Sequence, residues 1–331
     1  MGGDDDVGAL SSLGVCTVGE DEGTSVGLKF IEMNSRREFM AISRMRFRAA
    51  NNGTYYIDLA KALSLQERKM HRQKMIYTVY GGYFVDSQGN RIDINTAPMT
   101  WVSKRAVNRG FAMWRKMTAK ALDDAGATSK SKYRDFKVLL DNQMGSSPLV
   151  PLDASNNNLY SVAPEWDYST LTSGDPDGPG GTPPDQYELQ IVGPHTGADP
   201  NWTRVGLIDS WYHSRPSPQT HDPKNIADTT DPLVNLFDDG DVLDDRLNII
   251  GAEGDAPPYD EDAMFGNAAA AGGSNNLQRQ STAQPTANTQ LVAPIHGFQA
   301  LCGLVQVVVG NDSASNAWEL VLDVETKGEK F

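Results

Sequence analysis

Short runs in which apolar and polar residues alternate recur along most of the chain. Such runs, when rich in aromatic and β-branched residues and bounded by turn-forming residues, are typical of half-buried β-strands. The runs that predict strands are Thr54–Leu59, Met75–Tyr80, Tyr83–Val85, Arg91–Ile94, Phe136–Leu140, Tyr187–Val192, Thr203–Tyr212, Phe298–Val309 and Trp318–Val324. Many short strands with long irregular connections indicate an antiparallel all-β fold and not a βαβ repeat.

Turn-forming residues predict how some of these strands are joined. Residues 86–90 (Asp-Ser-Gln-Gly-Asn) separate the strands at 83–85 and 91–94 and predict a hairpin between them. Residues 310–316 separate the last two predicted strands and predict a terminal hairpin.

One segment follows the helical period. Val102–Leu122 places Val107, Phe111, Trp114 and Ala121 on one face of a predicted helix. The opposite face carries the cations Arg105, Arg109, Lys116 and Lys120. An amphipathic helix with a basic outer face is therefore expected.

These patterns together predict an antiparallel two-sheet jelly-roll sandwich with one inserted amphipathic helix and long loops. A chain of 331 residues can form such a sandwich as a single domain. Residues 1–27 are rich in Gly, Ser and acids, so we expect them to form a flexible acidic arm. Residues 28–331 are then the jelly-roll domain.

The formal net charge of −14 is distributed unevenly along the chain. Residues 1–27 carry six acids and no Lys or Arg, residues 28–137 carry 22 Lys and Arg against nine acids, and residues 138–331 carry seven against 28. The middle block therefore has a charge of +13. If folding gathers this block on one surface, that surface attracts phosphate. The alternative is that folding mixes the blocks into an ordinary patchwork of charges.

Several cations in the middle block lie close together in the sequence. Met45 and Phe47 alternate with arginines, which predicts a strand with those arginines on one face. Ser64–Lys74 is polar and basic, and it predicts a short helix or a basic loop. The residues predicted to contact nucleic-acid phosphates are Arg36, Arg37, Arg44, Arg46, Arg48, Arg68, Lys69, Arg72, Lys74, Arg105, Arg109, Lys116 and Lys120. The aromatic residues available to stack on unpaired bases are Tyr55, Tyr56, Trp101 and Trp114, although each residue type more often belongs to the core.

Motifs for catalysis are weak, and we predict no catalytic residue. Residues 23–27 match the letters of a nucleophile elbow, but an acidic arm precedes them instead of a strand. The five histidines are scattered without the spacing of metal ligands, and the chain has no glycine-rich phosphate-binding loop. Cys16 and Cys302 are the only cysteines, so no disulfide framework or thiolate zinc site is expected within one subunit.

A cluster of carboxylates is the one candidate for binding a metal ion. Its members, Asp238, Asp239, Asp241, Asp244 and Asp245, are offset only by the neighbouring Arg246. Crowded carboxylates bind Ca²⁺ through oxygen, or raise one another's pKa. We therefore expect either a structural Ca²⁺ at a subunit boundary or a solvated acidic loop.

Membrane segments and targeting signals are not expected. The longest apolar run, Leu301–Val309, is interrupted by Gln306 and falls short of the roughly 20 residues that a spanning helix needs. The start of the chain, Met-Gly-Gly-Asp-Asp-Asp, has no basic region followed by an apolar one.

The chain resembles the capsid proteins of small circular Rep-encoding single-stranded DNA viruses (the CRESS type), in particular those from marine and invertebrate-associated samples. The segments that carry the resemblance are Tyr55–Lys61, Arg68–Lys74, Ala97–Trp101, Lys132–Leu140, Asp231–Asp238 and Pro257–Asp260. The resemblance implies a jelly-roll subunit that assembles with about 60 copies of itself into an icosahedral T=1 shell. It further implies packaging of single-stranded DNA without sequence preference, in a virion assembled inside the host cell.

The chain departs from this family at its N-terminus. Many relatives begin with an arginine-rich arm that faces the genome, whereas this chain begins with glycine and aspartate. A folded basic inner wall supplied by residues 28–137 is the expected substitute. The main rival interpretation is a non-viral β-sandwich binding or adhesion module for a carbohydrate or protein ligand, which would stay monomeric or form small oligomers.

Overall fold

The computed structural model describes residues 41–126, 133–145, 147–160, 162, 165–172, 186–194, 204–214, 277–287, 289–310 and 316–331. The strands in this part are β1 (Ile42–Ala49), β2 (Gly53–Asp58), β3 (Ile76–Val85), β4 (Ile92–Thr96), β5 (Thr170–Thr172), β6 (Gln186–Gln190), β7 (Arg204–Gly206), β8 (Gln278–Ala283), β9 (Val292–Leu301), β10 (Leu304–Val309) and β11 (Trp318–Glu325). The helices are α1 (Leu59–Glu67), α2 (Trp101–Asp124) and α3 (Leu207–His213).

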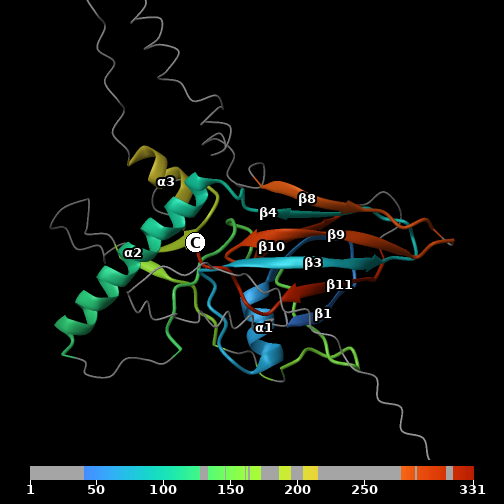
Figure 1. Cartoon of the computed structure of the whole chain (residues 1–331), viewed down its shortest axis with the longest axis horizontal. Helices are drawn as coiled ribbons and strands as arrows, with labels where there is room; N and C mark the ends of the chain where they lie inside the picture. The colour runs from blue at the N-terminus through green and yellow to red at the C-terminus, as the bar shows by residue number, and fades with distance from the viewer. Residues whose placement is uncertain are drawn as a thin grey trace, which may run out of the picture. The chain divides into compact units, whose positions relative to one another are not determined.

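Eight of the strands form two four-stranded antiparallel sheets, in the orders β1-β11-β3-β9 and β2-β10-β4-β8 (Figure 1). The pairings join strands from opposite ends of the chain: β1 with β11, β2 with β10, β3 with β9, and β4 with β8. The chain is therefore one long antiparallel ribbon rolled up so that β1, β2, β3 and β4 alternate between the sheets. This is the topology of a jelly roll, and the predicted fold class is confirmed.

Strand β1 shows how the sequence pattern builds the sandwich. Met45, Phe47 and Ala49 are buried, while Arg44 and Arg48 on the other face of the strand are exposed. Side chains along a strand point to alternate faces, so the apolar set enters the space between the sheets. Apolar side chains from both sheets fill that space and form one continuous core.

A pair of glycines lets β3 continue through what the sequence suggests is a break. A Cβ added to Gly82 would lie 1.9 Å from the carbonyl oxygen of Val321 on β11, which is far inside van der Waals contact. Gly81 has a φ of 153°, in the region that favours glycine, and the pairing of β3 with β11 shifts register nearby. The runs 75–80 and 83–85 therefore form one bulged strand.

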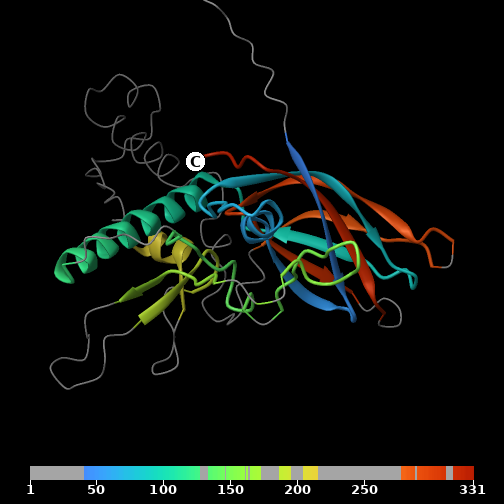
Figure 2. The same ribbon diagram turned by 90° about the horizontal axis from the view of Figure 1, so that it is seen from below.

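A large insertion occupies the tip of the rolled ribbon, between β4 and β8. It contains α2, α3 and a small sheet in the order β5-β6-β7 (Figure 2). A second apolar cluster joins the insertion to the end of the sandwich, through residues such as Val107 of α2, Phe136, Leu189 of β6, Leu207 of α3 and Leu304 of β10. The insertion is thus held on the sandwich by a core of its own.

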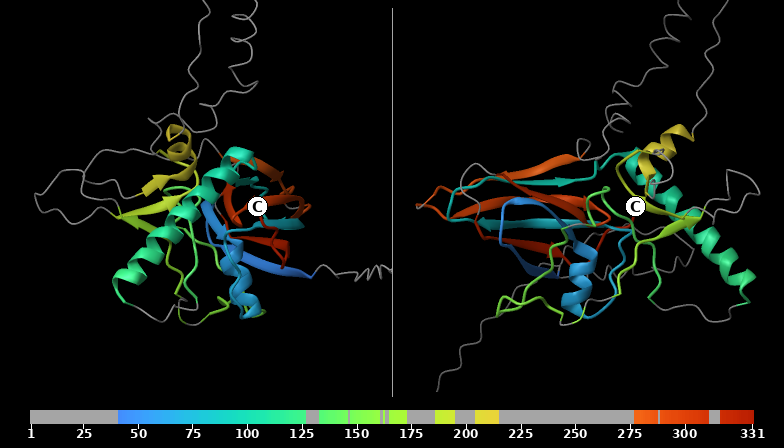
Figure 3. Two further views of the ribbon diagram at one scale, coloured as in Figure 1. Left: turned by 60° about the vertical axis from the view of Figure 1, so that its left-hand side comes forward. Right: turned by 180° about the vertical axis from the view of Figure 1, so that it is seen from behind.

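The first half of α2 packs into this cluster and the second half does not. Val102, Ala106 and Val107 are buried, whereas most residues after Phe111 are exposed or half-buried. In both views of Figure 3 the later part of α2 extends beyond the sheets.

No helix in the described part of the chain is long and apolar enough to cross a membrane.

Two predicted hairpins are wrong. Residues 83–85 and 92–96 belong to β3 and β4, which lie in different sheets, and β10 and β11 are likewise split between the sheets. Each turn carries the chain across the sandwich, as a jelly roll requires. The run 298–309 also contains a tight turn at Cys302 and Gly303, which separates β9 from β10.

Two strand predictions in the insertion also differ from the structure. The run 136–140 is buried and extended but forms only an isolated bridge, between Leu139 and Gln190. The run 203–212 is mainly helix α3, because Leu207, Ile208 and Trp211 also fit the spacing of one helical face. The described residues contain three helices and not one, and α1 begins five residues before the basic stretch from which a short helix or loop is predicted.

A buried polar network joins the sandwich to the insertion. The hydroxyl of Tyr56 on β2 donates to the Asp141 carboxylate at 2.8 Å, and the Gln306 amide on β10 donates to both, at 3.0 and 3.3 Å. Burial raises the pKa of Asp141, while the hydroxyl of Tyr56 partly offsets this effect. The hydroxyl of Tyr56 therefore stabilises the ionised form of the Asp141 carboxylate.

Replacing Tyr56 by Phe is expected to lower the free energy of unfolding by about 1–3 kcal/mol at neutral pH, because it leaves a buried carboxylate oxygen without its hydroxyl donor. The pKa of Asp141 is already raised, so the stability that this group contributes in its protonated form is lost as pH rises through that pKa. The loss in Tyr56→Phe should therefore shrink at acidic pH. Urea unfolding at several pH values measures it, and a loss that does not depend on pH would contradict this account.

Candidate nucleic-acid interface

The predicted row of arginines exists on β1, but acids on β11 neutralise most of it. Arg44 makes a two-point ion pair with Asp323, at 2.7 and 2.8 Å. Arg46 pairs with Glu319 at 2.7 Å and 3.1 Å and also donates to Asn156. The pKa of the Asp323 carboxyl lies below its usual range because of the Arg44 guanidinium.

This arrangement reduces the attraction of the β1 row for phosphate. In the described part only Arg48 of the three β1 arginines lacks an ion pair. A phosphate at Arg44 or Arg46 would have to displace a carboxylate from a well-aligned pair. The assignment of these arginines to nucleic acid stays a prediction, and the exposed cations of α2 are better placed for it.

The exposed side of α2 carries cations without carboxylate partners. Arg105, Arg109, Lys116 and Lys120 are all exposed, and none forms an ion pair with another described residue. At 100° per residue these four side chains fall within about 60° around the helix axis and extend over about 22 Å along it. We call them the α2 stripe. The predicted basic outer face of the helix is therefore present.

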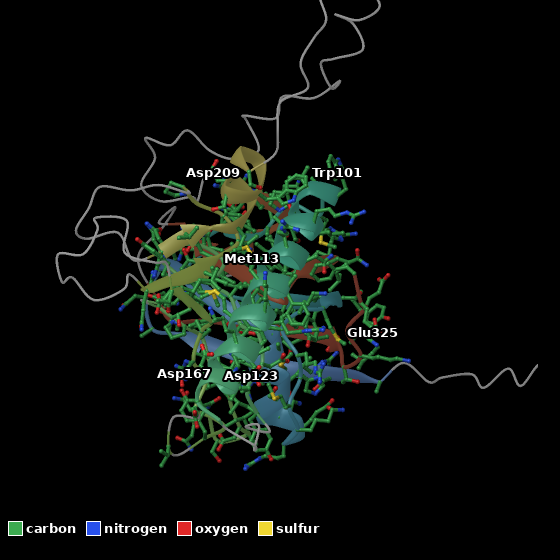
Figure 4. All side chains as sticks on the ribbon, turned by 90° about the vertical axis from the view of Figure 1, so that its left-hand side faces the viewer. Trp101, Met113, Asp123, Asp167, Asp209 and Glu325 are labelled. Carbon is green, nitrogen blue, oxygen red and sulfur yellow. The ribbon has the colours of Figure 1, made fainter. Side chains whose placement is uncertain are left out.

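Exposed apolar side chains lie next to the α2 stripe. Figure 4 looks onto this side of α2, with Trp101 at its beginning, Met113 midway and Asp123 near its end. Trp101 and Met113 are about half exposed. A shallow hollow between Arg109 and Lys116 is lined by Ala112, Met113 and Met117. This side of α2 can make apolar as well as ionic contacts.

The basic stretch after α1 takes its shape from the end of that helix. Asp58 caps the start of α1 by accepting a hydrogen bond from the Lys61 N–H at 3.1 Å. Arg68 ends the helix in the left-handed conformation, with a φ of 55°. The chain then turns back, so Lys69 and Arg72 lie beside α1 and do not continue it.

A cavity of about 650 Å³ lies beside α1, and we call it the α1 pocket. Its charged lining comprises Lys61, Arg68, Lys69, Arg72, Lys137 and Glu165. Tyr133 and Trp166 supply aromatic rings. Five cations against one acid make this cavity attractive to an anion, and its volume is in the range of small-molecule sites.

Nearby acids engage two of these five cations. Lys69 pairs with Glu67 at 2.5 Å, and Arg72 lies 3.7 Å from Asp135. The other predicted cation of this stretch, Lys74, lies outside the lining. Its ammonium packs over the rings of Phe111 and Phe331 and has a lowered pKa because of burial. Lys74 therefore packs on the apolar rings, and its contact with phosphate stays a prediction.

Asp58 anchors one side of the α1 pocket. Its carboxylate accepts hydrogen bonds from Trp166 Nε1 at 3.0 Å and from the Gln73 amide at 3.1 Å, besides capping α1. Burial raises its pKa to about 6, although Lys61, Trp166 Nε1 and the Ala60 N–H act in the opposite direction. The unfolded chain would hold this proton with a pKa of about 3.9.

The raised pKa of Asp58 predicts how stability depends on pH. Stability from its protonated form is fully present below about pH 4 and is lost as pH rises through about 6. Relative to Asp58→Asn, which does not titrate, the wild-type protein should lose about 2–3 kcal/mol of unfolding free energy between pH 4 and pH 7. Urea unfolding of both proteins across this range measures the difference. Parallel stability curves would mean that Asp58 titrates normally.

Of the aromatic residues predicted to stack on bases, most are used in packing. Tyr56 is buried in the polar network, Tyr55 packs edge-on against Trp318, and Trp114 packs on Phe111. Trp101 alone among the four is exposed, and it makes an edge contact with Trp211.

Several predicted residues lie outside the part of the chain that the structure describes. These are Arg36, Arg37 and the acidic cluster Asp238, Asp239, Asp241, Asp244 and Asp245. Among the residues that are described, no group of three or more His, Cys, Asp or Glu side chains is placed to hold a metal ion. The Ca²⁺ site at a subunit boundary therefore stays a prediction.

The pocket residues Lys61, Tyr133, Lys137 and Trp166 were not predicted as site residues from the sequence. Lys137 lies within a run that looks like a strand, and Trp166 lies in a loop far along the chain. The partial signal was the basic stretch 68–74, but the residues opposite it are brought there by long-range folding.

Comparisons of the chain with protein-family models, curated proteins and solved structures found no match.

Proposed function

We propose that this chain is a viral coat protein whose subunits assemble into a small icosahedral shell and package single-stranded DNA without sequence preference. The jelly-roll topology supports this proposal, since it is a fold that virus capsids use. The fold alone is not sufficient, because unrelated functions share it. The charged side chains on the surface are therefore also needed as support.

The observation that carries the proposal is the concentration of cations on the α2 stripe and in the α1 pocket of a chain with a charge of −14. The α2 stripe has four cations without ion pairs among the described residues, and the α1 pocket has five cations against one acid. Such surfaces bind phosphates without reading bases.

The inside of the sandwich argues against a ligand-binding barrel. Large apolar side chains such as Phe47, Phe84 and Trp318 fill the space between the sheets in the described part. A binding function must therefore use the outer surface or the insertion, as a shell subunit does.

Exposed apolar side chains at separate places support assembly. Ile42 begins β1, Leu291 and Val292 lie at the start of β9, and Met113 lies on α2, and all four are about half exposed. A subunit of a closed shell contacts several neighbours through different surfaces, so it needs more than one such place.

Sedimentation tests this proposal. The full-length protein should sediment as a particle far larger than the 36.0 kDa subunit and should protect nucleic acid from nuclease. A protein that stays monomeric or forms small oligomers across pH, salt and concentration would instead favour a β-sandwich binding module, and the α1 pocket would then be its ligand site.

A further inference from the structure

The α1 pocket contains a buried cation without a counterion. Lys137 is only 7% exposed, and no described carboxylate pairs with its ammonium group. Its Nζ atom lies 4.9 Å from the centre of the Trp166 ring, which compensates the charge only in part. A ligand anion in this cavity would therefore supply the ionic partner that the described carboxylates do not give to Lys137.

Hydrogen bonds hold Lys137 in position. Its backbone N–H donates to the Ser169 hydroxyl at 3.0 Å, and the Ser169 N–H donates back to its carbonyl at 2.8 Å. The Gln73 side chain bonds both backbone groups of the next residue, Val138, at 2.5 and 3.0 Å. Because Gln73 and Trp166 both bond Asp58, the two sides of the pocket are tied to the start of α1. The cavity is therefore preorganised.

The pocket combines this anion site with an exposed aromatic ring. Tyr133 lies on the lining and is 64% exposed, so one face of a flat ligand can pack on it. A second hollow of about 510 Å³ shares Tyr133, Lys137 and Glu165 with the α1 pocket. That second hollow has three acids, Asp135, Glu165 and Asp167, against two cations, so the site for an anion is the α1 pocket itself.

We infer that the α1 pocket binds a nucleotide of an unpaired strand, with phosphate at Lys137, Lys61 and Arg68 and the base against Tyr133. This inference rests on the proposed function and makes it more specific. Individual nucleotides of the packaged strand bind in a defined pocket, in addition to the non-specific electrostatic attraction of the strand to the basic surface. In a duplex each base is stacked on its neighbours and its Watson–Crick edge is paired, so the base cannot enter the pocket. Duplex DNA should therefore bind less well at this site.

Binding of three probes to the full-length protein tests the inference. The probes are a short single-stranded oligodeoxynucleotide, its duplex form and inorganic phosphate. Lys137→Met keeps the length of the side chain but removes its charge, and it should weaken oligonucleotide and phosphate binding about tenfold or more. Tyr133→Ala should weaken oligonucleotide binding about tenfold and leave phosphate binding unchanged, whereas Tyr133→Phe should bind as the wild type does.

The outcomes separate the pocket from the proposed function. If charge reversal of the α2 stripe abolishes oligonucleotide binding while both pocket variants bind normally, the pocket inference is wrong and the proposed function stands. If Lys137→Met loses phosphate binding but Tyr133→Ala keeps full oligonucleotide binding, the pocket is an anion site without a base, which also overturns the inference. If the wild-type protein binds none of the nucleic-acid probes, the proposed function fails as well. Because Tyr133 is exposed, its variants should fold even if Lys137→Met does not.

Discussion

Simultaneous replacement of the α2 stripe by glutamate (Arg105→Glu, Arg109→Glu, Lys116→Glu and Lys120→Glu) is expected to lower affinity for single-stranded DNA on the order of 100-fold at physiological salt. Each cation that neutralises a phosphate releases a counterion, so losing four contacts should also reduce the slope of log affinity against log salt by about 3. The side chains are exposed and form no ion pair with a described residue, so the fold should remain intact. Shells should still form but contain less nucleic acid.

The matched control keeps every charge and changes every side chain. Arg105→Lys, Arg109→Lys, Lys116→Arg and Lys120→Arg together should preserve both affinity and salt slope if these residues act as charges. Fluorescence anisotropy with a labelled oligonucleotide measures both quantities. Unchanged binding in the glutamate variant would remove the α2 stripe from the interface.

Trp318→Ala is expected to cost about 3–5 kcal/mol of unfolding free energy. Trp318 is 1% exposed, packs edge-on against Tyr55 at 5.3 Å and against Phe84 at 5.9 Å, and its Nε1 donates to the Asn51 carbonyl at 2.9 Å. Its removal leaves a cavity between the sheets and an unused hydrogen-bond acceptor. Urea unfolding of unassembled subunits, followed by circular dichroism, measures the loss.

Trp101→Ala is the matched control for this core variant. Trp101 is 51% exposed and contacts Trp211 edge to face, so its loss should cost about 1 kcal/mol or less. Equal losses at the two positions would contradict the packing of the sandwich described here.

Local pattern was enough to predict most strands of the sandwich and the main helix, but no predicted run covered β8 or the first part of β9. The alternation of Met45 and Phe47 with arginines places those arginines on the outer face of β1, and the apolar spacing of α2 places its cations outward. Both periods are properties of neighbouring residues, so they can be read from the sequence. Local pattern gave a wrong strand prediction at 203–212, because Leu207, Ile208 and Trp211 also fit the spacing of one helical face and lie in α3.

Pairing between distant strands could not be read in this way. A turn such as 86–90 permits a hairpin, but in a jelly roll the better partners of β3 are β11 and β9, which come from the end of the chain. The same limit applies to charge. Arg44 looks free in the sequence, and only the register of β1 with β11 places Asp323 beside it.

The α1 pocket illustrates the part of the site that sequence could not provide. Arg68 and Arg72 were found from their local concentration, whereas Lys137 and Trp166 reach them only through the hydrogen bonds of Asp58 and Gln73. Lys74 shows the converse, since it shares the basic stretch but turns toward Phe111 and Phe331.

Electron microscopy of particles purified with their nucleic acid tests the central claim most directly. The account predicts closed, roughly spherical shells of jelly-roll subunits, with the α2 stripe on the inner wall and nucleic-acid density against it. Absence of closed particles across pH, salt and protein concentration, or shells in which the α2 stripe faces outward and is remote from the nucleic acid, would contradict it.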